Sequence, residues 1–291
     1  MPSLSRRTLL AAAAVAASAG ARAQPVPTVA TYPLAADPPP THALDRQDIE
    51  TGAGPCRLHR ALPVGEPPAA GWPALWMLDG NAAFNRLPAA LLASFPGLAV
   101  VGVGYPVPGE FAARERARDY TPAAAGPAAD GRHPDRVTGG DGVFRAALLG
   151  PLRAAAAAGT RLDPARATLW GHSYGGLFTL ATLFATPGAF AAWVPVSPST
   201  GFGDGVLARL ADAAPPVPSG RARVLILVGG SEGRSAAAAE PRPSPATLAL
   251  AARLAERPDL DVEVRVLAGL GHGATLAASF PDALATAAGR A

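Results

Sequence analysis

The sequence predicts an α/β protein with a mostly parallel central sheet, helices on both of its faces and antiparallel strands at its N-terminal end. From residue 74 onward, short apolar runs alternate with segments of helical spacing. This order is typical of parallel strands joined by crossover helices. Before residue 74, segments 44–50 and 57–62 are joined by a Gly/Pro turn, and alternation in the second favours a half-exposed antiparallel edge.

Continuous apolar runs mark the expected strands of the parallel part. They are expected at 74–78, 98–103, 166–171, 190–196, 224–228 and 262–267. A run without polar interruption is typical of a strand buried on both faces. Helices are expected at 82–94, 141–158, 174–186, 204–213, 245–257 and 275–288. Pro151 should kink the second helix or begin a new segment there, because proline removes a backbone donor.

The N-terminal segment resembles an export signal. Arg6 and Arg7 precede an apolar run that is too short to span a bilayer, and a small-residue cleavage pattern ends at Ala23. Residues 1–23 are therefore predicted to be a twin-arginine-type signal peptide, with a disordered N-terminus or an uncleaved anchor as the alternatives. We expect a periplasmic or secreted bacterial protein that meets the Tat export machinery and keeps no stable membrane anchor.

Beyond this leader, the sequence predicts one domain. Residues 24–42 are rich in proline and are expected to form an extended linker. Residues 43–291 are long enough for a single α/β domain with a sizeable core. Within it, residues 105–140 have no long apolar period and contain several prolines. Because a loop of this length is usually functional, residues 105–140 are interpreted as a lid or wall loop over the functional site of the domain.

The composition excludes several classes of function. All 25 basic residues are arginines, and the net charge of +3 comes from three arginines in the leader, since the other 22 match the 22 acids. The charge therefore gives no argument for nucleic-acid binding. Cys56 is the only cysteine, which excludes an intrachain disulfide and a cysteine zinc site. Neither a metal motif nor a nucleotide-binding motif is present, so no cofactor is predicted.

The pattern Gly-His-Ser-Tyr-Gly at residues 171–175 fits G-x-S-x-G, the nucleophile elbow. An apolar strand precedes it and an amphipathic helix follows. Glycines two residues before and after the serine leave room for the sharp turn. The alternative is an ordinary glycine turn before a helix. The context favours Ser173 as a nucleophile at the N-terminus of a helix, where developing negative charge is stabilised.

A serine nucleophile needs a base, and the base needs an orienting acid. His272 lies in a glycine loop after the last strand and is the predicted base. Glu232 follows the strand at 224–228 and is the predicted acid. Asp259 and Asp261 are the alternative acids, but they precede the last strand and so belong to the opposite sheet edge. The chain order of serine, acid and histidine is that of the α/β-hydrolases.

An oxyanion hole must stabilise the tetrahedral intermediate. One donor is expected to be the backbone N–H of Tyr174, and the other the backbone N–H of Gly80 or Asn81 after the strand at 74–78. Asp79 is interpreted as a turn-forming residue. His172 is expected to point away from the elbow.

Several segments together resemble the putative-esterase (esterase D-like) branch of the α/β-hydrolases, near the periplasmic siderophore esterases that cleave enterobactin. The segments that carry this resemblance are 78–81, 101–106, 118–122, 171–178, 197–199 and 271–273. The resemblance implies a carboxylester hydrolase with Ser173 as nucleophile and His272 as base. The family usually carries tryptophan after Ser-Pro-Ser, whereas Thr-Gly-Phe stands at 200–202 here, which reduces an aromatic wall.

We therefore predict an exported serine carboxylester hydrolase that acts through an acyl-enzyme on siderophore-type or other small esters. Arg118, Tyr105 and Ser197 are the candidates for contact with the substrate. The alternatives are an acyltransferase with the same triad and a non-catalytic periplasmic binding protein on a hydrolase scaffold. Product analysis with an added alcohol distinguishes the first alternative, and tight binding without turnover would favour the second.

Overall fold

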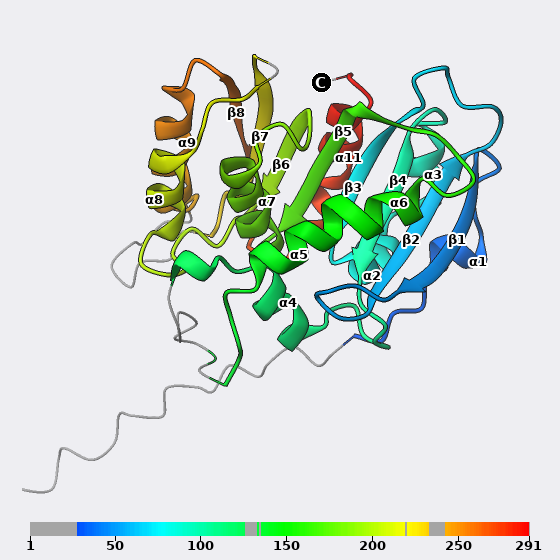
Figure 1. Ribbon diagram of the computed structural model, residues 1–291, viewed down its shortest axis with the longest axis horizontal. Coiled ribbons are helices and arrows are strands. Elements are labelled where there is room, and N and C mark those ends of the chain that lie inside the picture. Colours follow the sequence, from blue (N-terminus) through cyan, green and yellow to red (C-terminus); the bar gives the residue numbers. More distant parts are fainter. Residues whose placement is uncertain (1–27, 126–132, 134, 219, 233–241, 291) are drawn as a thin grey trace, which may run out of the picture.

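The computed structural model describes residues 28–125, 133, 135–218, 220–232 and 242–290. Their eight-stranded sheet has the order β1-β2-β4-β3-β5-β6-β7-β8 (Figure 1). The strands are β1 His42–Ile49, β2 Cys56–Pro63, β3 Trp72–Leu78, β4 Ala99–Gly104, β5 Leu162–His172, β6 Ala192–Val196, β7 Ala222–Gly229 and β8 Leu260–Leu267. Strand β2 is antiparallel to β1 and β4, and the pairs from β4 to β8 are parallel. The predicted α/β class is therefore confirmed.

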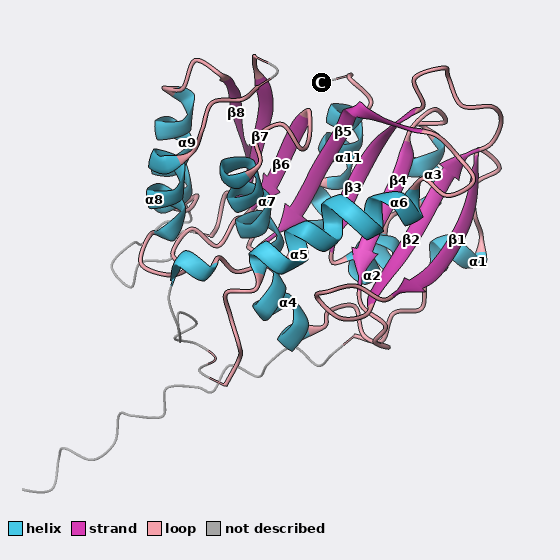
Figure 2. Cartoon of the chain, in the orientation of Figure 1, coloured by secondary structure: helices cyan, strands magenta, loops and turns pink. Residues whose placement is uncertain are grey.

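Helices cover both faces of this sheet, as Figure 2 shows. They are α1 Pro33–Ala36, α2 Gly80–Arg86, α3 Ala89–Ala93, α4 Ala113–Asp119, α5 Asp141–Ala147, α6 Arg153–Ala156, α7 Tyr174–Ala185, α8 Val206–Ala213, α9 Pro245–Ala255, α10 Thr275–Ala278 and α11 Phe280–Ala287. A π-helical segment, Leu148–Leu152, joins α5 to α6 and contains Pro151 at the predicted interruption. None of the helices in the described part is long and apolar enough to cross a membrane.

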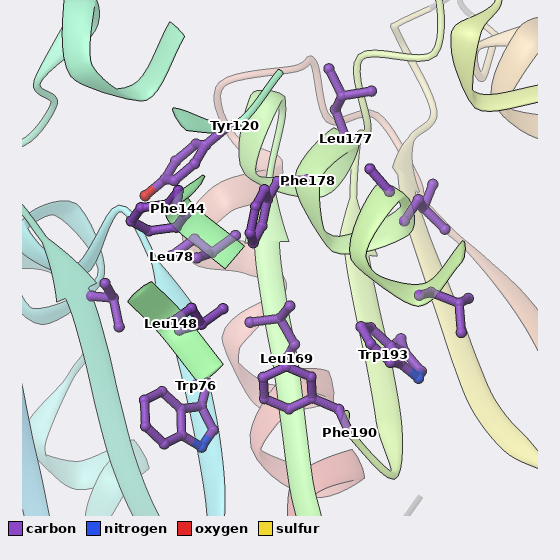
Figure 3. Packing of buried hydrophobic residues seen from close by; sticks show 14 of the residues in the cluster. Trp76, Leu78, Tyr120, Phe144, Leu148, Leu169, Leu177, Phe178, Phe190 and Trp193 are labelled. Carbon is purple, nitrogen blue, oxygen red and sulfur yellow. The ribbon is translucent and has the colours of Figure 1, made fainter. Parts of the chain in front are cut away.

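Two hydrophobic clusters hold the helices to the sheet. In β3, Trp76 and Leu78 belong to the cluster under α5 to α9, whereas Leu75 and Met77 belong to the cluster under α1 to α3, α10 and α11. Successive side chains of a strand point to opposite faces, so an unbroken apolar run serves both clusters. Figure 3 shows part of the first cluster, where Phe178 of α7 lies beside aromatic side chains of other segments.

Two predicted helices are broken in the structure. The helix expected at 82–94 ends at Arg86, and α3 begins at Ala89, because Pro88 cannot donate the backbone hydrogen bond that a continuous helix needs. The helix expected at 275–288 is divided into α10 and α11 close to Pro281 for the same reason. Proline outweighs apolar periodicity at both positions.

The N-terminal linker prediction is wrong for residues 28–42. Val29 forms an isolated bridge with Gly109, and the side chain of Leu34 in α1 is buried. The backbone N–H groups of Thr31 and Tyr32 donate to Asn85 Oδ1 at 2.7 and 2.8 Å. This segment is thus part of the domain. The predicted signal peptide at 1–23 lies outside the described residues and stays a prediction.

The segment predicted as a lid or wall loop, 105–140, contains a helix. Helix α4 occupies Ala113–Asp119, and Tyr120 directly after it is fully buried. The Tyr120 ring packs against Phe144 and Phe178, with centroid separations of 5.3 and 5.7 Å (Figure 3). The first part of this segment is therefore anchored in the core. Its function as a lid stays a prediction.

Candidate active site

The predicted elbow joins the end of β5 to the start of α7. Ser173 has φ 60° and ψ −114°, a strained conformation that costs about 1–3 kcal/mol in a residue with a side chain. A Cβ atom at Gly171 would overlap the backbone carbonyl of Gly175, and a Cβ at Gly176 would lie 2.9 Å from the oxygen of Val196. Gly171 and Gly176 therefore allow the close approach that turns Ser173 out of the sheet. The prediction is wrong for Gly175, where a Cβ atom would meet only ordinary contacts from 3.5 Å outward.

The structure brings Ser173, His272 and Glu232 together at the carboxyl edge of the parallel strands. His272 Nε2 lies 3.0 Å from Ser173 Oγ. His272 Nδ1 lies 3.7 Å from Glu232 Oε2. The two ring nitrogens thus face the serine and the acid separately, which is the orientation that a general base requires. His272 is half exposed and Glu232 is nearly buried, so the group opens to solvent on the side of the histidine.

The other carboxylate oxygen of Glu232, Oε1, accepts two hydrogen bonds. Ser197 Oγ donates a hydrogen bond to Glu232 Oε1, and the backbone N–H of Gly229 donates to the same oxygen at 2.8 Å. Burial by itself raises the pKa of Glu232. The neighbouring His272 ring and the hydrogen bonds from Ser197 and Gly229 outweigh the burial and lower that pKa below its ordinary value. The acid is therefore ionised at neutral pH.

The two alternative acids lie elsewhere, as the strand order predicted. Asp259 accepts from Arg257 and from the backbone N–H of Val217. Asp261 is exposed near Arg221, at the start of β8. Both carboxylates are at the opposite end of the strand from His272.

The residues proposed for the oxyanion hole lie at two helix starts. Tyr174 is the first residue of α7, and Gly80 and Asn81 are the first residues of α2. The side chain of Asn81 is buried, and its Nδ2 donates to the carbonyl oxygens of Tyr105 and Gly109 at 2.9 and 3.1 Å. Only the backbone amide of Asn81 is therefore left for an oxyanion, and this function stays a prediction.

Asp79 does more than form a turn. Its φ of 50° fits the expected turn, and its buried carboxylate accepts two hydrogen bonds from Arg116, at 2.9 and 2.8 Å. The Arg116 guanidinium also lies 5.4 Å from the centroid of the Tyr174 ring. Arg116 was not among the residues that the sequence predicted for the site. The Asp79–Arg116 ion pair thus connects the turn after β3 to the elbow.

The prediction for His172 is incomplete, because its ring lies against His272. The two ring centroids are 4.9 Å apart, and His172 Nε2 is 2.8 Å from the backbone oxygen of His272. Burial lowers the pKa of His172 to about 3, so its ring is neutral at physiological pH. The sequence contained an indication that His172 makes such a contact, because a histidine at the end of a buried strand needs a hydrogen-bond partner.

The candidates for substrate contact are corrected by the structure. Tyr105 and Ser197 are 3% and 1% exposed, and the Tyr105 hydroxyl donates to Asp119 Oδ2 at 3.0 Å. Neither hydroxyl is therefore accessible to a substrate. Arg118 is partly exposed, but its guanidinium binds the Asp119 carboxylate and the oxygen of Ala53. Sequence reasoning did not distinguish these structural roles from contact with a ligand.

Parts of the chain are similar in sequence to known proteins. A model of the prolyl oligopeptidase family matches residues 149–202, which include the elbow. The chain is 38% identical over 175 residues to the apo-salmochelin esterase of Escherichia coli O6:H1 (strain CFT073), covering 58% of this chain and 54% of that protein. It is 33% identical over 150 residues to the ferri-bacillibactin esterase BesA of Bacillus subtilis (strain 168), covering 47% and 51%. The chain thus spans about half the length of the curated relatives it matches.

A solved structure extends the similarity to the whole domain. The enterobactin hydrolase IroE, in its complex with DFP, has a TM-score of 0.74 at 29% identity, over 88% of this chain and 99% of that chain. The chain has the α/β-hydrolase fold. The resemblance to siderophore esterases that the sequence motifs indicated is confirmed by these relatives. In this fold, Ser173, Glu232 and His272 follow the ends of β5, β7 and β8.

Proposed function

We propose that the chain is a serine carboxylester hydrolase that works through an acyl-enzyme. The observation that carries this proposal is the 3.0 Å separation of Ser173 Oγ from His272 Nε2, at a serine held in the strained elbow conformation. A serine hydroxyl becomes a nucleophile when a positioned base accepts its proton. The neighbouring Glu232 carboxylate, 3.7 Å from the other ring nitrogen, supports this function for His272.

The proposed reaction has two halves. Ser173 Oγ attacks the ester carbonyl carbon while His272 takes the hydroxyl proton, and His272 then gives that proton to the departing alkoxide as the carbon–oxygen bond breaks. Water then attacks the acyl carbon while His272 takes its proton, and His272 returns that proton to Ser173 Oγ as the acyl–Oγ bond breaks and the carboxylic acid is released. Glu232 orients the imidazole and stabilises its protonated form in both halves. The backbone amides of Tyr174 and of Gly80 or Asn81 are the proposed oxyanion donors.

Siderophore-type esters are the proposed substrate class, together with other small esters. The curated relatives are named as esterases of siderophores, which supports this choice. The exposed side of His272 leaves the site open to solvent, which suits a substrate larger than a simple ester. The proposed chemistry needs no metal or cofactor, and the only proposed partner is the small-molecule ester.

The deciding experiment is turnover of p-nitrophenyl acetate and butyrate by the full chain, beside Ser173→Ala. We expect the substitution to lower kcat by about a thousandfold or more, because the nucleophile is lost. Equal activity of the two proteins would contradict the assignment of Ser173. A parallel reaction with an added alcohol tests the acyltransferase alternative, in which a new ester would form instead of the free acid.

Export through the twin-arginine route is proposed from residues 1–23 alone. The paired Arg6 and Arg7 support it, because this class of signal is read through two consecutive arginines. In a bacterial host with a Tat system, we expect the full chain to reach the periplasm or medium. Arg6→Lys with Arg7→Lys should retain it inside the cell, as measured by fractionation and immunoblotting. Equal export of both forms would contradict the proposal.

A further inference from the structure

Three buried polar side chains lie behind the site and are not used by the proposed mechanism. They are His172 at the end of β5, Ser197 directly after β6 and Thr275 at the start of α10. Their exposed fractions are 5%, 1% and 0%. Buried polar groups are costly unless they are hydrogen-bonded, so each of their hydrogens should have a partner. We call these three residues the support relay.

The hydrogen of Ser197 is assigned by its partner. Glu232 is ionised and can only accept, so Ser197 Oγ must donate to Glu232 Oε1. A hydroxyl has one hydrogen, and the lone pairs of Ser197 therefore remain to accept another bond. Thr275 Oγ1 lies 2.7 Å from Ser197 Oγ, within hydrogen-bond distance. The hydroxyls of Ser197 and Thr275 thus connect the Glu232 carboxylate to the backbone oxygen of His272.

The other end of the support relay reaches His272. The backbone oxygen of His272 can only accept, and it lies 2.8 Å from His172 Nε2 and 2.7 Å from Thr275 Oγ1. Thr275 Oγ1 donates to this oxygen. Because the carbonyl oxygen cannot donate, the ring nitrogen that contacts it must be protonated, so His172 carries its proton on Nε2 and also donates here. His172 Nε2 is also 3.2 Å from Thr275 Oγ1, so the same N–H faces both oxygens.

This arrangement ties the acid to the backbone of the base. We propose that the support relay positions Glu232 and His272 relative to each other, so that the imidazole stays aligned with Ser173. The proposal rests on the proposed function, because it assigns positioning residues to that same site. None of the three side chains touches the ester. They act on the reaction through Glu232 and His272. Because the Oε2–Nδ1 separation is already 3.7 Å, a further displacement of either side chain would weaken the interaction between the carboxylate and the imidazole.

The test compares Thr275→Val with Thr275→Ser in the full chain. Valine keeps the shape of the fully buried side chain and removes its hydroxyl, whereas serine keeps the hydroxyl. The matched control is Thr182→Val in α7, because the Thr182 hydroxyl is equally buried and makes no hydrogen bond within the described part of the chain. Thermal unfolding and circular dichroism establish that every variant is folded.

For Thr275→Val we expect kcat on p-nitrophenyl acetate to fall about tenfold to a hundredfold, with KM within about twofold, because alignment and not binding is lost. Labelling of Ser173 by diisopropyl fluorophosphate, followed by intact-protein mass, should slow by a similar factor. Thr275→Ser and Thr182→Val should stay within about threefold of the parent in both measurements. Full activity of Thr275→Val, or an equal loss in Thr275→Ser, would overturn the relay.

A measurement without catalysis separates this proposal from the proposed function. Nitrogen-15 spectra of the histidine rings should show His172 as the neutral Nε2–H form from pH 5 to 8. A charged ring or the Nδ1–H form would overturn the relay, whatever the activity. If the parent neither cleaves esters nor is labelled while His172 has the expected form, the proposed function fails and the hydrogen-bond assignment stands.

Discussion

At the scale of single residues, the site depends on the contacts that hold the Glu232 carboxylate in place. Glu232 has one oxygen held by Ser197 and Gly229 and the other directed to His272. The hydrogen bonds to the oxygen that faces away from His272 thus fix the position of this carboxylate. In the proposed reaction, a charge placed in this way would stabilise the imidazolium that forms on His272.

Removing the charge of Glu232 tests this placement. Glu232→Gln keeps the size of the side chain, and we expect kcat/KM for p-nitrophenyl acetate to fall by roughly a thousandfold or more, because the imidazolium loses its counter-charge. The matched control is Asp261→Asn, an exposed carboxylate at the opposite end of β8. It should leave kcat/KM unchanged. A fall in both variants, or in neither, would contradict Glu232 as the acid.

At the scale of elements, the elbow between β5 and α7 depends on close backbone packing. Gly176 packs against the oxygen of Val196 and the Cα of Pro198, which follow the neighbouring strand β6. The backbone N–H of Ser173 donates to the oxygen of Val196 at 3.0 Å. The turn is therefore held by β6 as well as by its own sequence.

A methyl group at Gly171 should disrupt this element. Gly171→Ala would place Cβ into the backbone of Gly175, and we expect a loss of a few kcal/mol in the free energy of unfolding, about the upper range for single substitutions, together with loss of activity. The control is Gly201→Ala, where a Cβ meets no atom within 4 Å. Urea unfolding and p-nitrophenyl acetate turnover measure both effects. A stable and active Gly171→Ala would show that the elbow can relax.

At the scale of the whole molecule, three buried histidines make stability depend on pH. Burial lowers the pKa of His59 to about 4 and that of His172 to about 3, and it also lowers the pKa of His42. These rings are neutral in the folded chain and take up a proton on unfolding once the pH falls below about 6.5. The unfolded state then binds more protons, so stability decreases as the pH falls.

The expected size of this effect can be measured. Between pH 7 and pH 5, His59 should account for a loss of about 2 kcal/mol in the free energy of unfolding. Urea unfolding at pH 5, 6 and 7 measures the slope. His59→Gln keeps a donor for Asn81 Oδ1, which lies 3.1 Å from His59 Nε2, but does not titrate. The loss in the free energy of unfolding between pH 7 and pH 5 should be smaller by about 2 kcal/mol in this variant than in the parent. Identical slopes would contradict a neutral buried His59.

Sequence reasoning succeeded where the signal was local. The apolar run at 74–78 and the glycines around Ser173 predicted a buried strand and an elbow, because burial and close backbone approach restrict the residue types at those positions. It failed for residues 28–42, where proline-rich composition hid the buried Leu34, and for Tyr105, whose hydroxyl binds Asp119. Exposure of a polar side chain depends on neighbours that are distant in the chain.

By itself, the sequence determined the order of strands and helices, the class of the fold and the end of each strand at which Ser173, Glu232 and His272 lie. Only the tertiary structure decided that the serine and the histidine, 99 residues apart, come within 3.0 Å. It also decided that His172 and Ser197 are buried and contact His272 and Glu232. The reason is physical, since periodicity reports which face of an element is buried, whereas side-chain contacts depend on the register between strands and on the packing of loops that follow them.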